Sequence, residues 1–151
     1  MTNWRLASRK KALENRAATI NAVRDFFRER QYLEVETPYR IPAPAPESHI
    51  DAIPTDGWFL HTSPELCMKR LLAAGYPRIF QISHCWREGE RGRRHISEFT
   101  MLEWYRAGAE YNGLMDETEA LVKSVVRKVK GRSTLTYQRR RIGLSRAWPR
   151  L

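Results

Sequence analysis

The 151-residue chain has only two cysteines, Cys67 and Cys85, and they do not form a Cys-x-x-Cys pair. This is too few for a disulfide framework, so we expect free thiols in a reducing compartment. The four histidines share no zinc-ligand spacing with these cysteines. The sequence therefore predicts no structural metal and no metal ligand of any other kind in this portion.

Long apolar runs are also missing. No stretch approaches the roughly 18 consecutive apolar residues of a membrane-spanning helix. The charges near the N-terminus are not followed by the apolar segment of a secretory signal. We therefore expect no membrane partner and a cytoplasmic location. A hydrophobic content of 42% is enough to build the core of one ordinary domain.

Positive charge is abundant, with a net charge of +10 and a pI of about 10.1. Such a surface attracts polyanions, which include nucleic acid, ATP and acidic proteins. Solubility alone is the alternative explanation. The arginines cluster rather than scatter, which favours binding of a partner.

The spacing of apolar residues predicts both helices and strands. Leu13, Ala17, Ile20, Val23 and Phe27 lie on one face of a helix from about residue 10 to 30. The further elements are a strand at 32–37, a stiff extended connector at 41–46, a strand at 58–61, a helix from 63 that ends at Gly75, antiparallel strands at 78–86 and 98–106, and a helix at 112–130. No element is predicted after Gly131, and the tail with Arg139–Arg141 ends without one.

The loop between the two long strands, residues 87–97, holds four arginines, a histidine and two glycines. Arginine forks bind phosphate oxygens, and glycines let a loop fold over a flat ligand. A long hairpin with a solvated, charged tip explains the same composition. The chain has neither a P-loop nor a Rossmann fingerprint, so any nucleotide site is of another type.

The strand after this loop places a carboxylate between apolar neighbours. Phe99, Met101, Glu103 and Tyr105 share one face by alternation. A half-buried carboxylate needs a partner, which is either a cationic ligand or an internal Arg or Lys. Glu65, at the start of a helix, is a second candidate ligand, and stabilisation of the helix dipole explains it equally well.

Residues 86–90 (Trp-Arg-Glu-Gly-Glu) and 95–105 (His-Ile-Ser-Glu-Phe-Thr-Met-Leu-Glu-Trp-Tyr) together resemble motif 2 of class II lysyl-tRNA synthetases. They are most similar to the paralogous elongation factor P–(R)-β-lysine ligase family. Residues 62–72 are also family-like, and residues 34–38 (Glu-Val-Glu-Thr-Pro) look like the end of motif 1. The resemblance covers residues 10–130 and implies an α+β fold, namely a partial class II catalytic domain with a mainly antiparallel sheet flanked by helices.

The resemblance also implies roles for individual residues. Arg87 would be catalytic and bind the ATP α-phosphate and the amino-acid carboxylate. The implied ATP-binding residues are Arg87, Glu88, Gly89, Glu90, His95, Ile96 and Phe99. The implied substrate-binding residues are Ser63, Pro64, Glu65, Glu103 and Tyr105. The reaction would join lysine or β-lysine to AMP as an adenylate, release pyrophosphate, and pass the aminoacyl group to an acceptor.

The sequence departs from the family pattern in three places. Gly89 stands where the family has an acid, and Ile96-Ser97 replaces Asn-Pro. Motif 1 is expected at about 12–38 and motif 2 at about 79–105, whereas motif 3 is absent. The carboxylates that would hold Mg²⁺ are absent with it. We therefore expect residues 1–151 alone to form little or no adenylate. The resemblance to motif 1 separately implies a homodimer through that motif.

The acceptor is predicted from what precedes the first helix. About ten residues leave no room for an anticodon-binding domain, which needs on the order of 100 residues. This favours elongation factor P as the acceptor over tRNA. Two alternatives are lysyl-tRNA synthetase activity and a truncated, non-catalytic remnant that binds ATP, RNA or an acidic protein. The sequence leaves the choice between α-lysine and β-lysine open.

Overall fold

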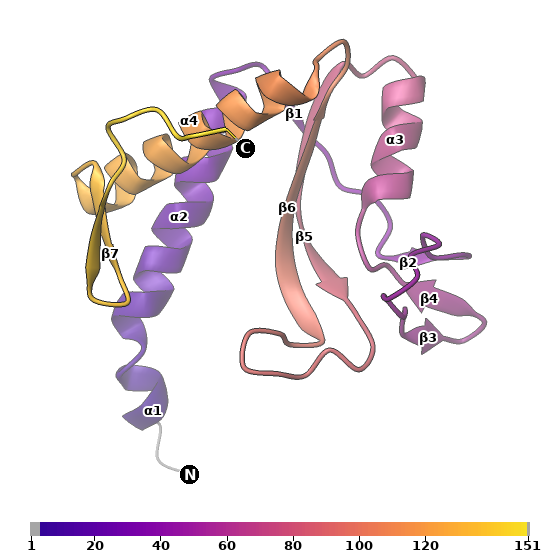
Figure 1. Ribbon diagram of the computed structural model, residues 1–151. Coiled ribbons are helices and arrows are strands. Elements are labelled where there is room, and N and C mark those ends of the chain that lie inside the picture. The colour runs from indigo at the N-terminus through magenta and orange to yellow at the C-terminus, as the bar shows by residue number, and fades with distance from the viewer. Residues whose placement is uncertain (1–3, 151) are drawn as a thin grey trace. The chain divides into compact units, whose positions relative to one another are not determined.

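The structure is a computed structural model that describes residues 4–150 (Figure 1). The chain divides into two compact units, one made of Met1–Arg30 with Ala109–Leu151 and the other of Gln31–Gly108. Helices combined with mostly antiparallel sheets confirm the predicted α+β class. Among the described residues, no helix is both long and apolar enough to cross a membrane.

The first unit is built on two packed helices, α2 (Lys10–Arg28) and α4 (Tyr111–Lys130), after a short α1 (Trp4–Ala7). The predicted apolar stripe of α2 is only partly correct, because Leu13 is 60% exposed. Burial is confined to the second half of α2, at Ala22, Phe26 and Phe27. Helix α4 ends at Gly131 as predicted, since that glycine adopts the left-handed conformation with φ of 65°.

No element was predicted after Gly131, but the structure has two strands there. Strands β7 (Thr134–Tyr137) and β8 (Arg140–Gly143) form an antiparallel hairpin. Both residues of its turn, Gln138 and Arg139, have positive φ, 47° and 63°. Such turns normally carry Asn or Gly. The composition of this turn therefore gave no signal for a hairpin.

The second unit contains a three-stranded sheet in the order β1–β5–β6. Its long hairpin, β5 (Arg78–Trp86) and β6 (Glu98–Arg106), has the predicted bounds and is antiparallel. Strand β1 is shorter than predicted, only Leu33–Glu34, and runs parallel to β5. Beyond it, the Thr37 hydroxyl bonds to the side chain of Gln81 at 3.0 Å. The chain thus continues beside β5 through a side-chain contact instead of a regular ladder.

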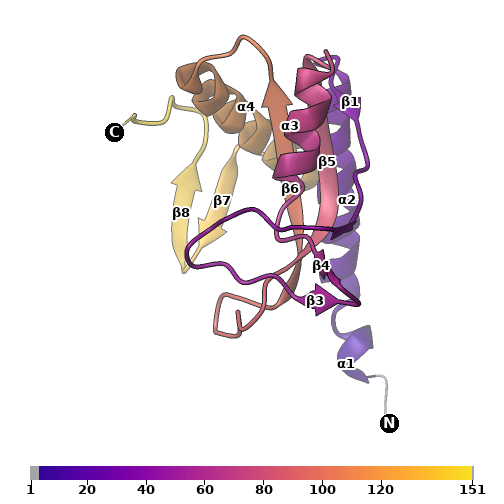
Figure 2. The ribbon, with the colours of Figure 1, turned by 90° about the vertical axis from the view of Figure 1, so that its right-hand side faces the viewer.

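A smaller sheet in the order β2–β4–β3 completes this unit with one helix. Its strands are β2 (Arg40–Ile41), β3 (Pro54–Thr55) and β4 (Trp58–Leu60). Residues 42–46 are neither helix nor strand, as the connector requires. Helix α3 (Glu65–Ala73) starts after Pro64 and ends two residues before Gly75. Figure 2 shows α3 running alongside the β5–β6 hairpin, which it contacts.

One face of the long hairpin lies in the core of the second unit, and Phe80 on the other face of β5 is buried as well. On β5, Ile79, Gln81, Ser83 and Cys85 are all buried on the first face. The strand register places Tyr105, Glu103, Met101 and Phe99 of β6 opposite these residues. Paired residues of an antiparallel sheet point to the same side, so these β6 residues lie on the same face as the buried residues of β5. Glu103 and Tyr105 on this face belong to the candidate site.

Candidate active site

Glu103 lies at the centre of a hydrogen-bonded cluster on β6. Ser63 donates to its Oε2 at 2.7 Å, and the Tyr105 hydroxyl donates to its Oε1 at 2.6 Å. Within residues 4–150, no Lys, Arg or His forms an ion pair with Glu103, so the internal cation considered from the sequence is not its partner. A carboxylate has about four lone-pair positions. Two hydroxyls occupy two of them, and the others can accept from an ammonium group.

The start of helix α3 holds Ser63 in place. The backbone N–H of Glu65 donates to Ser63 Oγ at 3.1 Å, while the same hydroxyl donates to Glu103. Pro64 is buried at the N-cap position between them. The Glu65 carboxylate forms an ion pair with Lys69, one turn along the helix. Ser63 and Glu103 are therefore joined directly, whereas Glu65 joins the cluster through its backbone.

The Tyr105 hydroxyl is held in its neutral form. Burial raises the pKa of Tyr105 well above its ordinary value, and the hydrogen bond to the Glu103 carboxylate raises it further. Both effects disfavour the phenolate. Tyr105 is thus a permanent donor to Glu103, which keeps that carboxylate an acceptor toward any third group.

A second cluster surrounds Arg87, directly after β5. Its guanidinium carbon lies 5.1 Å from the ring centroid of Phe99. A cavity of about 180 Å³ opens beside these two residues, and its lining comprises Arg87, Glu90, Arg94, His95, Ile96 and Phe99. Since pockets for drug-sized ligands measure roughly 300–1,000 Å³, this cavity can take one part of a nucleotide, such as a flat ring against Phe99.

Backbone contacts join the two clusters. Arg87 Nε donates to the carbonyl of Thr62 at 3.5 Å, and Thr62 directly precedes Ser63. Arg87 Nη1 lies 3.7 Å from Glu90 Oε1. The backbone N–H of Arg87 donates to the carbonyl of Ser97 across the loop at 2.9 Å. A fixed cation and a carboxylate with spare lone pairs thus lie along one strand face. That arrangement can hold an anionic group and an amine at the same time.

Comparison with known proteins decides the family. The model of tRNA synthetases class II (D, K and N) matches residues 1–151. The chain belongs to the class II tRNA synthetases. It is 43% identical over 147 residues to a protein of Vibrio campbellii named elongation factor P–(R)-β-lysine ligase, covering 91% of this chain and 45% of that one. This confirms the resemblance predicted from motif 2.

Lysine–tRNA ligases are similar as well. That of Magnetococcus marinus is 40% identical over 145 residues, which cover 91% of this chain and 29% of the relative. An elongation factor P–(R)-β-lysine ligase of Vibrio cholerae is 44% identical over 139 residues, covering 84% and 43%. The chain therefore spans less than half the length of the curated relatives it matches.

The structure separates some residues that the sequence grouped as one ATP site in this class II synthetase chain. Glu90, His95, Ile96 and Phe99 line the Arg87 cavity, but Glu88 does not. Glu88 lines a different cavity of about 590 Å³, formed mainly by residues 44–54. Gly89 forms the turn between them with φ of 72°. Among the roles that the resemblance implies, the contact of Glu88 with nucleotide is therefore the one that the geometry supports least.

Two buried polar groups escaped the sequence reasoning. Gln81 is 1% exposed, and its Nε2 has no hydrogen-bond partner in the described chain, although it lies opposite Glu103 in the strand register. His61 is equally buried, with Nε2 at 2.6 Å from the carbonyl of His84 and Nδ1 unpartnered. Burial lowers the pKa of His61. A polar residue at a buried strand position was the available signal for Gln81.

Proposed function

We propose that the chain contributes to a ligase that activates lysine or β-lysine with ATP and transfers the aminoacyl group to elongation factor P. The single observation that carries the proposal is the Glu103 cluster. Within residues 4–150, it offers a carboxylate with two neutral donors and no cationic side chain paired to it. A lysine-type substrate brings the ammonium group that such a carboxylate lacks.

The arrangement of Arg87 supports the nucleotide half of the proposal. We assign Arg87 to the α-phosphate and the substrate carboxylate, and Phe99 to the adenine ring. The substrate carboxylate attacks the α-phosphorus, a carboxyl–phosphate bond forms, and the bond to pyrophosphate breaks. Arg87 stabilises the charge that develops on the phosphate oxygens. Ser63, Pro64 and Glu65 orient the amine through Glu103 and the backbone.

We expect the carboxylates that hold Mg²⁺ to come from another part of the protein. No three side chains of His, Cys, Asp or Glu within residues 4–150 gather where they could hold a metal ion. We therefore assign no step to Mg²⁺ in this part of the protein. Charge neutralisation within the described site comes from Arg87 and Arg94 on the cavity wall.

The acceptor is chosen from the relatives. Proteins named elongation factor P–(R)-β-lysine ligase reach 43–44% identity, and those named lysine–tRNA ligase reach 40%. This supports elongation factor P as acceptor. Transfer to tRNA is the second candidate, because lysine–tRNA ligases of three different genera are among the relatives. A homodimer through residues 12–38 remains a prediction.

The test is a chimera in which residues 1–151 replace the matching segment of the Vibrio campbellii ligase. The chimera should catalyse lysine- or β-lysine-dependent exchange of pyrophosphate into ATP, and should label elongation factor P rather than tRNA with radiolabelled substrate. Label on tRNA alone would favour the second candidate. A folded chimera without exchange would contradict the activation proposal itself.

The catalytic assignment has its own variant. Arg87→Ala in the chimera should reduce exchange by roughly 10²- to 10³-fold, the usual cost of losing one transition-state donor. Arg91→Ala is the matched control, because Arg91 is exposed in the same loop and does not line the cavity. Near-normal exchange by the Arg87 variant would remove this residue from the mechanism.

A further inference from the structure

The net charge of the chain is concentrated at one end. Residues 120–151 hold ten of the 27 Lys and Arg residues and none of the 17 Asp and Glu residues. Residues 1–119 hold 17 of each kind and are therefore neutral overall. The whole surplus of +10 thus belongs to the end of α4, the β7–β8 hairpin and the segment after it.

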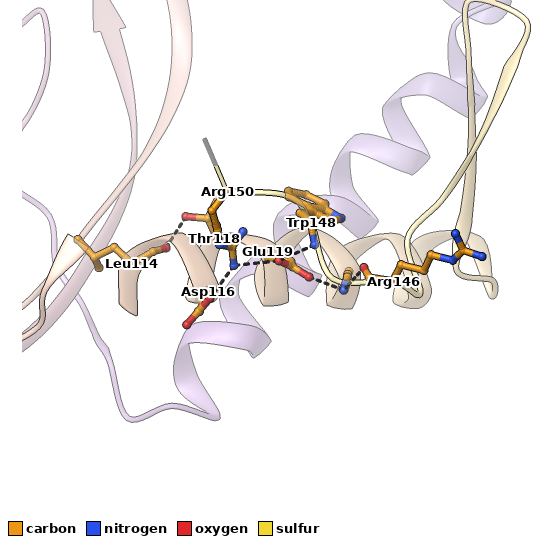
Figure 3. Close-up of polar contacts among 8 residues, drawn as sticks. Leu114, Asp116, Thr118, Glu119, Arg146, Trp148 and Arg150 are labelled. Atoms are coloured by element: carbon orange, nitrogen blue, oxygen red, sulfur yellow. Dashed lines mark hydrogen bonds and ion pairs between the residues drawn. The ribbon is translucent and has the colours of Figure 1, made fainter. Parts of the chain in front are cut away.

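Three of these ten cations have structural partners. Lys123 and Arg150 both pair with Glu119, at 2.5 and 2.9 Å, and Arg150 also reaches Asp116 (Figure 3). The backbone N–H of Trp148 donates to the same Glu119 at 3.2 Å. Lys128 pairs with Asp25 and Glu29 of α2. These contacts fix the chain on both sides of the hairpin to the helices.

The other seven cations have no partner within the described residues. Each is exposed, and none of their cationic side chains forms a hydrogen bond or ion pair with residues 4–150. Arg146 accepts a hydrogen bond from Lys123 only through its backbone carbonyl. They are Arg127, Lys130, Arg132, Arg139, Arg140, Arg141 and Arg146. The three paired cations of this segment stabilise the unit through acids of the helices. The seven unpaired ones either bind a partner or only make the protein more soluble.

The hairpin presents its arginines in several directions. The register pairs Tyr137 with Arg140 and Thr136 with Arg141. Because side chains alternate along a strand, Arg140 and Arg141 project from opposite faces, and Arg139 lies at the turn. All four residues of β8 are exposed. Figure 2 shows β7 and β8 side by side as a narrow two-stranded ribbon.

We propose that the β7–β8 hairpin is a ribbon that binds the phosphate backbone of a nucleic acid. A groove of a duplex has phosphates along both walls, which suits cations on both faces and at the tip of a narrow ribbon. Six of the seven unpaired cations are arginines, whose forks match phosphate oxygens. Tyr137 is 60% exposed beside Arg140 and offers a surface for base or sugar contacts. The inference does not depend on the proposed ligase activity.

The experiment measures Kd against salt concentration for the whole chain, with an RNA hairpin, a DNA duplex of matching sequence and polyglutamate as separate ligands. For duplex DNA, the slope of log K against log salt is about −0.9 for each phosphate neutralised. Replacement of Arg139, Arg140 and Arg141 by Gln should reduce that slope by about 2–3 and weaken binding by roughly 10- to 100-fold at low salt. The RNA and DNA arms identify which backbone is bound.

A charge-matched control decides between a site and general attraction. Arg9, Lys10 and Lys11 are exposed at the start of α2, and their replacement by Gln gives the same net charge as the hairpin variant. Equal loss of binding in both variants, or tighter binding of polyglutamate than of either nucleic acid, would overturn the proposal.

A measurement on the unaltered chain guards against a variant that misfolds. Bound nucleic acid should slow the modification of Arg139–Arg141 by phenylglyoxal, while modification of Arg9 continues at its original rate. Unchanged modification of the three hairpin arginines in the presence of saturating nucleic acid would also overturn the proposal.

Discussion

The two hairpins of this chain differ in almost every physical respect. Strands β5 and β6 have nine residues each, and one face is buried and carries the hydrogen-bonded Glu103 cluster. Strands β7 and β8 have four residues each, and β8 is exposed throughout. The first hairpin holds the Glu103 carboxylate against two hydroxyl donors, whereas the second exposes its arginine side chains to solvent.

The buried hairpin is suited to positioning a reacting group, and the exposed hairpin is suited to attracting a polyanion. A buried carboxylate is useful only if its neighbours fix it, since desolvation makes every unpaired group costly. An exposed arginine costs little to keep unpaired and acts over roughly a Debye length of 10 Å at 0.1 M salt. Chemistry is therefore expected at β5–β6, and capture of a polyanion at β7–β8.

The largest expected effect compares apolar residues of the two hairpins. Phe80 on β5 is completely buried, and Ile142 on β8 is 41% exposed. Phe80→Ala should lower the free energy of unfolding by about 3–5 kcal/mol, because it leaves a cavity in the core. Ile142→Ala should change it by about 0.5 kcal/mol or less. Urea unfolding measures both, and similar losses would mean that the hairpins are equally packed.

The next comparison uses one acid from each unit, assayed in the chimera. Glu103→Gln should raise the KM for lysine by roughly 10- to 100-fold, since a hydrogen bond to a charged group is worth about 1.5–3 kcal/mol. Glu119→Gln should leave KM unchanged, because Glu119 holds the C-terminal segment through Lys123 and Arg150. An unchanged KM in the Glu103 variant would show that this carboxylate does not contact the amine.

Two tyrosines give a smaller contrast. Tyr105→Phe removes the donor to Glu103 at 2.6 Å and should lower the free energy of unfolding by about 1–2 kcal/mol. Tyr137→Phe on the exposed ribbon should have almost no effect on unfolding. Thermal unfolding of the two variants checks this, and an equal shift in Tm would contradict the assigned role of the Tyr105 hydroxyl.

The smallest effect is a dependence of stability on pH that resides in the second unit. Burial lowers the pKa of His61 in the folded state, so below the ordinary value of about 6.5 the unfolded chain binds more protons than the folded one. Stability should therefore fall as pH decreases from 7 toward 5, by at most about 1.4 kcal/mol per pH unit. His61→Gln should flatten this decrease, whereas the exposed His49→Gln should leave it intact.

Patterns of regular elements were well predicted from the sequence. Strands β5 and β6 have the predicted bounds because alternation over nine residues is a strong signal, and Gly131 ends α4 as expected. The grouping of Ser63, Glu103 and Tyr105 followed from resemblance and agrees with their contacts. Their roles in binding remain proposals.

Other features depend on tertiary contacts that no local pattern contains. Strand β1 ends at Glu34, and beyond it Val35 donates to the backbone of Phe80 while Thr37 bonds to the side chain of Gln81. The exposure of Leu13 depends on how much of α2 the helix α4 covers. Glu88 turns to another cavity because its backbone N–H donates to Asp51, 37 positions earlier in the chain, at 2.8 Å.

We propose that Glu103 and Arg87 bind opposite ends of one reacting complex. A crystal structure of the chimera with lysine and a non-hydrolysable ATP analogue tests it most directly. We expect a substrate ammonium nitrogen within about 3.2 Å of a Glu103 oxygen and an α-phosphate oxygen at hydrogen-bond distance from Arg87. An ammonium group bound away from Glu103, or an α-phosphate without contact to Arg87, would contradict it.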